Sequence, residues 1–225
     1  MLDSLAFAVI VSLSFGEKSA MSQTIAQILK AFEATHHHQS MQQLAALYEE
    51  IEAQTTRFRQ EFSIFCGAGC GTCCEHFNPD ITALEASLVA AYLLLDEQKR
   101  PLIERLYNEG ADDGPCPLYD PESPFHCTVY EVRPLICRLF GASASLDKGG
   151  KAVFRRCKYN SEETMPALIS FDRPVATLQS YSYALRSLDG RDVDLLSSQV
   201  RMLVEQLQFL ISLLENDDDD SPLAS

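Results

Sequence analysis

The nine residues from position 66 to position 74 contain four thiols and three glycines. The thiols are those of Cys66, Cys70, Cys73 and Cys74. Thiolates are soft ligands that select zinc, copper(I) or iron–sulfur centres. Glycine between them lets the backbone turn tightly and lets N–H groups approach the sulfurs. The spacing therefore predicts a metal-binding loop.

Four further cysteines follow, so that all eight in the chain lie between positions 66 and 157. They are Cys116, Cys127, Cys137 and Cys157. A lone cysteine is often a small core residue, and this interpretation stays open for Cys157. We predict that all eight are metal ligands, because eight thiolates could supply two four-thiolate sites or one cluster with spare ligands.

Adjacent thiols raise the alternative of a reactive cysteine. Cys70 and Cys73 have the spacing of a thiolate chelate, and thioredoxin-type redox sites share that spacing but follow a strand within a βαβ unit, which is not visible here. Cys73 and Cys74 point to opposite faces of an extended backbone. One of them, or Cys157, could be a nucleophile beside a metal.

Histidines and arginines accompany the cysteines along the chain. His76 and His126 each lie within two residues of a cysteine and could replace a thiolate as ligand. Arg133 and Arg138 lie near Cys137 and could offset the negative charge of a thiolate-rich centre. The alternative for both arginines is surface ion pairing in an acidic protein.

The elements that must position these residues are predicted to be helical. A capping-box pattern at Thr82 and Glu85 precedes an apolar segment through Leu95, which we expect to be a central helix. A 3-4-3-4 spacing of stripe residues predicts a long helix that runs directly into the cysteine loop. The stripe consists of Met41, Leu44, Tyr48, Ile51, Thr55, Phe58, Phe62 and Phe65.

The second half of the chain mixes loop, strand and helix. Prolines and glycines predict a loop over 111–127, and Pro134 permits a short helix that carries Cys137 and ends near Gly141. Residues 151–157 are compatible with a strand. Helices are expected over 175–188 and 193–214, the latter with a heptad stripe that serves bundle packing or a dimer seam.

Composition and length fit a single mainly α domain, a helical bundle around a loop-rich cysteine-cluster region. We expect this domain over residues 21–215, with the cysteine core at 60–160 and a disordered acidic tail over 216–225. Residues 1–20 are interpreted as a non-native or disordered extension before a start at Met21. The alternative is an export signal ending near Ala20, which would make disulfides possible.

The formal net charge of −14 arises from 32 acidic and 18 basic side chains. This balance argues against a nucleic-acid partner and against an anionic membrane surface. We expect a cytoplasmic protein with an unidentified protein or redox partner, present as a monomer or as a dimer through the helix at 191–215.

The cysteine pattern as a whole resembles the YkgJ-type cysteine-cluster family, described as a zinc- or iron-chelating domain with a Cys-x2-Cys-x2-Cys-Cys signature. The resemblance covers roughly residues 60–160, and Glu85 matches an acidic position of the family. The first gap holds three residues here instead of two. The matching motifs are Cys66-x3-Cys70-x2-Cys73-Cys74, Cys116-Pro117 and Cys127-x2-Tyr130-x2-Arg133-Pro134-x2-Cys137-Arg138.

The resemblance implies metal or iron–sulfur binding in a bacterial cytoplasm. Some members are labelled iron–sulfur oxidoreductases, and relatives include a longer flagellin lysine N-methylase, although this chain shows no separate S-adenosylmethionine signature. We expect an iron–sulfur cluster with a redox or modifying role, because bacterial ferredoxin runs also end in Cys-Pro. The alternative is a zinc-chelating structural or interaction module without catalysis. Whether the protein is an enzyme stays undecided.

Overall fold

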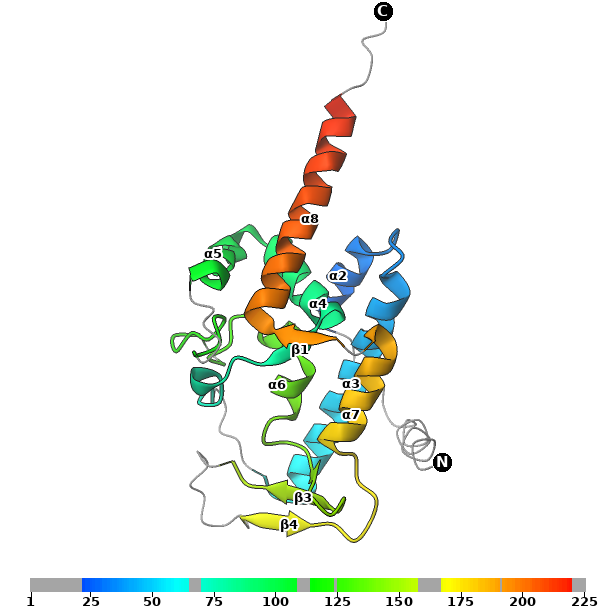
Figure 1. Ribbon diagram of the computed structural model, residues 1–225, viewed down its shortest axis with the longest axis vertical. Helices are drawn as coiled ribbons and strands as arrows, with labels where there is room; N and C mark the ends of the chain where they lie inside the picture. Colours follow the sequence, from blue (N-terminus) through cyan, green and yellow to red (C-terminus); the bar gives the residue numbers. More distant parts are fainter. Residues whose placement is uncertain are drawn as a thin grey trace, which may run out of the picture.

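The computed structural model describes residues 22–64, 70–108, 114–123, 125–157, 167–190 and 192–219, with side chains up to residue 209. These residues are mainly helical and include two small antiparallel sheets, which confirms the prediction of a mainly α protein. The described helices pack on one another, and the loops that carry the cysteines lie on one side of them (Figure 1). The described residues therefore do not show a bundle that encloses the cysteines.

Two helices begin the described chain, α2 (Gln23–Ala31) and α3 (His38–Glu61). The apolar stripe of α3 is buried from Met41 to Thr55, as predicted. The prediction that this helix runs directly into Cys66 is wrong, because α3 ends at Glu61 and Ser63 adopts a φ of 51°. A left-handed residue cannot continue a right-handed helix. Phe65 and Cys66 lie outside the described residues.

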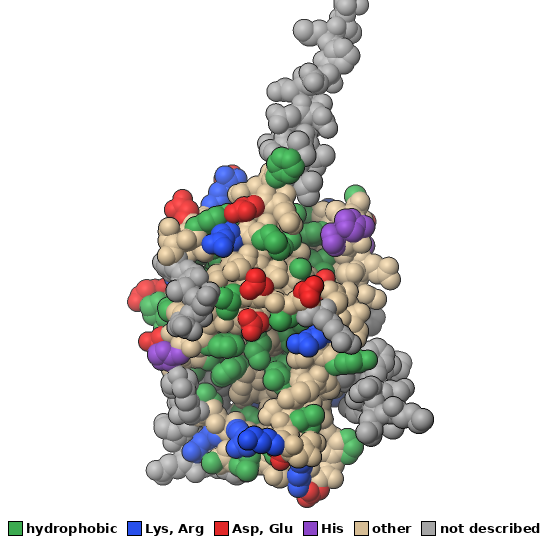
Figure 2. Space-filling model, viewed as in Figure 1, with side chains coloured by type: hydrophobic (Ala, Val, Ile, Leu, Met, Phe, Trp, Pro, Cys, Tyr) green, Lys and Arg blue, Asp and Glu red, His purple; other side chains and the backbone are tan. Residues whose placement is uncertain are grey.

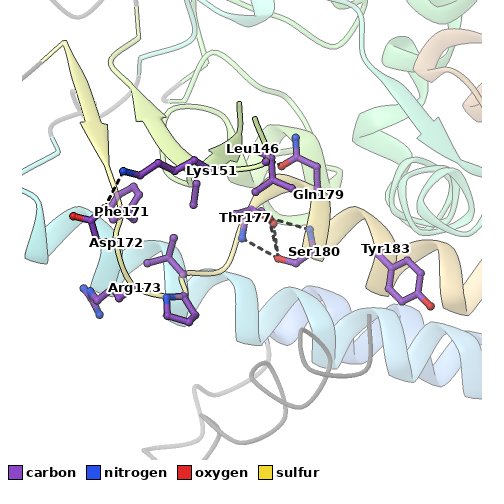
Figure 3. A pocket seen from close by; sticks show the side chains of 13 residues that line it. Leu146, Lys151, Phe171, Asp172, Arg173, Thr177, Gln179, Ser180 and Tyr183 are labelled. Atoms are coloured by element: carbon purple, nitrogen blue, oxygen red, sulfur yellow. Dashed lines mark hydrogen bonds and ion pairs between the residues drawn. The ribbon is translucent and has the colours of Figure 1, made fainter. Parts of the chain in front are cut away.

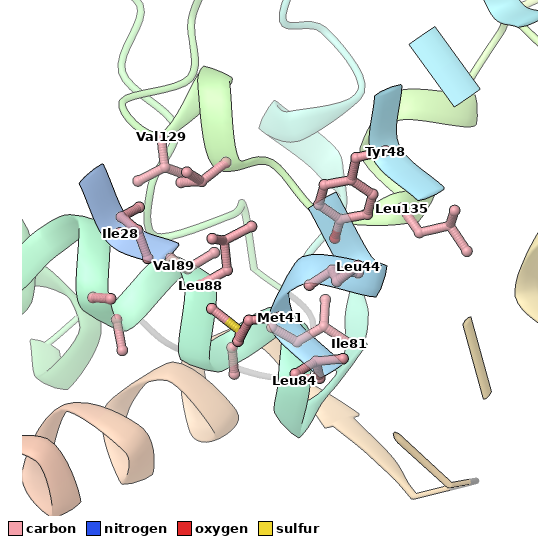
Figure 4. Close-up of a cluster of buried hydrophobic side chains, with 14 of the residues drawn as sticks. Ile28, Met41, Leu44, Tyr48, Ile81, Leu84, Leu88, Val89, Val129 and Leu135 are labelled. Atoms are coloured by element: carbon pink, nitrogen blue, oxygen red, sulfur yellow. The ribbon is translucent and has the colours of Figure 1, made fainter. Parts of the chain in front are cut away.

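Helix α4 (Ala83–Leu94) is the centre of the main core, as its apolar sequence predicts. Its N-terminus has the predicted capping box, in which the Thr82 hydroxyl accepts from the Glu85 N–H and the Glu85 carboxylate accepts from the Thr82 N–H. Figure 4 shows Leu84, Leu88 and Val89 of α4 beside side chains of α2 and α3. A helix that is apolar nearly all round requires such neighbours on every side.

The chain then crosses from α4 to the short helix that carries Cys137. A 3-10 turn, η2 (Glu97–Lys99), leads into α5 (Arg100–Asn108), and further 3-10 turns lie at η1 (Cys74–His76) and η3 (Tyr130–Val132). Helix α6 (Leu135–Leu139) begins after Pro134 and is followed by Gly141, whose φ is 65°. The predicted short helix and its stop are both confirmed.

A two-stranded sheet joins the middle of the chain to its C-terminal part. Strand β1 (Asp80–Thr82) pairs antiparallel with β5 (Val193–Leu195), and α8 (Leu196–Asp219) follows directly. Val193 was expected in the helical stripe, but it pairs with Thr82 instead. Helix α8 packs on α4 and α5 and continues to Asp219, so that residues 216–219 are helical where a disordered tail was expected.

A three-stranded sheet lies at the other end of the molecule. Its strands are β2 (Ser145–Leu146), β3 (Ala152–Arg155) and β4 (Leu168–Ser170), in that order, followed by α7 (Leu178–Asp189). Strand β3 confirms the strand expected within 151–157, whereas β2 and β4 were not predicted. Several basic side chains gather at this end of the molecule, and acidic ones lie over the helices (Figure 2). No helix in the described ranges has the length and hydropathy of a membrane span.

One buried carboxylate connects three helices. Glu85 of α4 accepts hydrogen bonds from the Tyr48 hydroxyl of α3 at 3.0 Å and from the Leu135 N–H of α6 at 2.7 Å. Its second oxygen accepts from the Thr82 N–H at 2.9 Å. Burial raises the pKa of Glu85, because removing a carboxylate from water penalises its charged form.

Replacement of Glu85 by Gln should destabilise the protein by about 1–3 kcal/mol, because one acceptor oxygen becomes an NH2 group that faces donors. The measurement is urea unfolding of the metal-free protein. The control is Glu104→Gln, the same chemical change at an exposed position of α5, which should stay within about 0.5 kcal/mol. Equal losses in the two variants would show that the network around Glu85 does not stabilise the fold.

The raised pKa of Glu85 also predicts a pH dependence. The pKa of Glu85 is about 4.3 in the unfolded state and higher in the folded state. At a pH between these two values, the folded state holds more protons than the unfolded state. The contribution of Glu85 to stability is therefore fully present below the unfolded pKa and is lost as the pH rises through the folded pKa. The stability difference between wild type and Glu85→Gln, measured from pH 4 to 8, should shrink as pH rises. A difference that grows would contradict the sign.

Candidate metal centre

Six cysteines line one cavity of about 330 Å³. They come from three separate segments: the loop that leads into η1, the proline-rich loop before η3, and helix α6. Helices α4 and α5 separate the first segment from the other two, so the fold itself brings these thiols together. The six are Cys70, Cys73, Cys74, Cys116, Cys127 and Cys137.

Direct contacts join the first two cysteine segments. The Cys116 N–H donates to the Cys74 carbonyl at 2.9 Å, which ties the two loops by their backbones. Gly71 packs against His126 so closely that a Cβ at position 71 would lie 2.1 Å from the His126 Cβ. Only glycine fits there. This explains one of the three glycines by close approach rather than by backbone conformation.

Hydrogen bonds within the proline-rich loop, and one from Arg105 of α5, hold this loop in place. The N–H and the hydroxyl of Thr128 both donate to the Leu118 carbonyl, and Tyr119 and Cys127 form an isolated antiparallel bridge. A guanidinium N–H of Arg105 donates to the Tyr119 carbonyl at 2.7 Å. These bonds give irregular backbone the partners that a sheet would otherwise supply, and they set the positions of Cys116 and Cys127.

Buried arginines hold the Cys137 segment against α3. Glu52 of α3 accepts from Arg133 and from Arg138, each at 2.7 Å. Arg138 also donates to the carbonyls of Arg133 and Glu131 and lies over the Tyr48 ring. The sequence suggested either a counter-charge to thiolates or surface ion pairing for these arginines. Their ion pair is with Glu52, which the sequence analysis did not single out, and both arginines are buried rather than on the surface. Burial raises the pKa of the Cys127 thiol, and the charges of Arg133 and Arg138 oppose that rise, as the counter-charge prediction requires.

The cavity thiols influence one another. A hydrogen bond with Cys74, together with burial, raises the pKa of Cys73. Burial raises the pKa of Cys116 to about 12, and burial together with the nearby Cys116 and Cys127 raises that of Cys137. Clustered thiols resist ionisation because each thiolate repels the next. Several of them can become thiolates together only if a cation offsets the charge.

The donor set fits a thiolate-bound metal. Among the described residues, no three His, Cys, Asp or Glu side chains come together closely enough to hold one metal ion, so the thiols line the cavity walls rather than meet at a point. Arg59 of α3 also lines this cavity, and its buried Nε–H has no hydrogen-bond partner within the described ranges. A buried donor beside thiols suits a site in which those thiols become anions.

Three predicted or alternative ligands do not line the cavity, and Cys66 lies outside the described residues. Cys157 does not line the cavity and lies instead near Gly141, after α6. His76 is exposed and lies 4.0 Å from Glu75, and His126 packs against Gly71. Neither histidine lines the cavity.

A second cavity, of about 660 Å³, lies between the three-stranded sheet and the start of α7 (Figure 3). No cysteine of the described ranges lines it. Its polar groups bond to one another or to neighbours, through the Thr177–Ser180 capping box and the 2.9 Å contact between the Lys151 ammonium and Asp172. The thiol cavity is therefore the stronger candidate for chemistry.

The fold and the cavity define a mainly helical protein that collects thiols from separated loops, as thiolate-metal proteins do. Residues 65–164, which include all eight cysteines, match the family model CxxCxxCC, described as "Putative zinc- or iron-chelating domain". This match agrees with the resemblance found in the cysteine motifs of the chain. No curated protein and no solved structure matches the chain.

Replacement of Glu52 by Ala should destabilise the metal-free protein by about 2–3 kcal/mol, because it leaves the guanidiniums of Arg133 and Arg138 buried without their carboxylate. The exposed third of Glu52 keeps this figure below that of a fully buried pair. Thermal unfolding measures it. Glu49→Ala, on the same helix and outside these contacts, is the control and should cost under about 1 kcal/mol. The ion-pair interpretation fails if the two losses are equal.

Proposed function

We propose that this protein binds a metal centre in the thiol cavity. The observation that carries the proposal is that six cysteines from three separate segments line one cavity. The proposed ligands come from these six, and Cys66, next to the loop in sequence, is a further candidate. Cys157 is not included, because it does not line the cavity.

An iron–sulfur cluster is the proposed form of this centre. A single zinc ion needs four ligands about 2.3 Å from one point, whereas the described thiols are spread over the walls of a cavity of about 330 Å³. A cluster of several atoms is held by thiolates at its corners and suits ligands that do not meet. When bound, it would supply one-electron redox chemistry.

The residues around the thiols would shield and tune such a centre. Phe77 and Phe140 contact each other with ring centres 6.0 Å apart, and the Phe125 ring stacks on Tyr130 at 4.1 Å. All four side chains line the cavity. Apolar walls lower the local dielectric, which governs redox potential and water access. The site therefore combines soft ligands with apolar walls, in keeping with a redox or modifying role.

Anaerobic purification followed by visible spectroscopy and by analysis of iron, sulfide and zinc tests the proposal. We expect a coloured protein that contains iron and acid-labile sulfide. A colourless protein that contains zinc would exclude the iron–sulfur centre and favour a zinc-chelating module. A protein that retains neither metal would exclude metal binding altogether.

Serine substitutions test which cysteines hold the metal. Cys137→Ser should lower the metal content at least about tenfold, because serine is a poor ligand for a soft metal. Cys157→Ser is the matched control and should retain the wild-type content. Metal analysis of the anaerobically purified variants measures both. Equal loss in the two variants would mean that the cavity does not define the ligand set.

A further inference from the structure

The thiol cavity contains an arginine, Arg59, that forms no ion pair with any described residue. Arg59 lines the cavity from the last turn of α3, and no described carboxylate pairs with it. Its Nε–H is buried and lacks an acceptor among the described residues. A cation in the last turn of a helix is favoured by the helix dipole, but that interaction leaves the buried N–H unsatisfied, which is costly.

The described Lys, Arg, Asp and Glu side chains that line the cavity are all positively charged. Within the described residues, its lining includes two arginines and no Asp or Glu, although the chain carries a net charge of −14. Arg133 is already engaged, since it donates to Glu52 and to the Tyr130 carbonyl and lies over the Tyr130 ring. Of the two arginines in the described lining, Arg59 is therefore the one whose guanidinium can bind a further anion.

The mouth of the cavity is apolar and open. Phe77, Phe125 and Phe140 line the cavity and are each 40–45% exposed, which places them where it meets the solvent. The lining also includes Val129 and Leu196, which are buried, and the partly buried Ile136. A pocket with apolar walls and one placed charge is typical of sites for small organic anions.

The size of the cavity limits such a ligand. About 330 Å³ corresponds to roughly ten water-sized groups at about 30 Å³ each. A metal centre would take part of this volume, so the remaining room suits a short molecule. One unpaired guanidinium matches one carboxylate, whose planar geometry fits the arginine fork.

We propose that Arg59 binds the carboxylate of a small apolar monocarboxylate that enters the thiol cavity beside the metal. This proposal rests on the proposed function and adds to it the chemical class of the ligand. Arg59 fixes the carboxylate, and the phenylalanine-lined mouth admits the apolar body. No bond is made or broken in this binding step.

Calorimetric titration of the metal-loaded full-length protein with butyrate and with butyramide tests the proposal. The two probes share their shape and differ in charge. We expect wild type to bind butyrate about 10- to 100-fold more tightly than butyramide. Arg59→Met should remove this preference while keeping the aliphatic stem. Arg59→Lys, which keeps the charge without the fork, should retain part of it.

Arg57→Met is the matched control, because Arg57 is exposed on the same helix, does not line the thiol cavity and donates to the Ala53 carbonyl. It should keep the full preference. The inference is overturned if wild type shows no preference, or if Arg59→Met keeps it. Loss of metal from Arg59→Met, with no preference in wild type, would mean that Arg59 serves only the thiolates. Elemental analysis of wild type separately decides the proposed function.

Discussion

The buried pairing between Glu52 and two arginines is the interaction on which the rest of the site depends. Arg133 and Arg138 flank Cys137, and their guanidiniums reach one carboxylate of α3. A buried ion pair adds little net stability compared with apolar packing, but it tolerates very few alternative arrangements. Glu85 also accepts a hydrogen bond from the Leu135 N–H at the start of α6. These two carboxylates together fix the position and rotation of α6, because a five-residue helix is too short to be stable alone.

Local sequence signals were reliable where one short segment determines the structure. The capping box at Thr82 and Glu85 and the helix between Pro134 and Gly141 follow from side chains within a few residues of one another. The stripe of α3 was also correctly located, but its end was not. Its periodicity continues through Phe62, which leaves the helix and packs on Phe171 beneath the three-stranded sheet.

The predictions from the sequence were wrong where contacts between distant segments determine the structure. Val193 continues a heptad pattern, yet it forms a strand because its partner Thr82, far away in sequence, offers an edge. Glu52 has no distinguishing local signal among the acidic residues of α3, and its role exists only because two arginines reach it. The density of cysteines predicted a common site, but only the tertiary structure separates Cys157 from the six thiols of the cavity.

The packing of α4 connects the cysteine motif to helices on either side of it in the sequence. Residues 65–164 carry the motif, but α4 lies against α8 on one side and α3 on another, and both helices lie outside that stretch. The central helix of the matched stretch is thus packed in part by helices that lie outside it. During synthesis the cysteine loops leave the ribosome before α8, so the packing of α4 against α8 can form only after residues 196–219 have emerged.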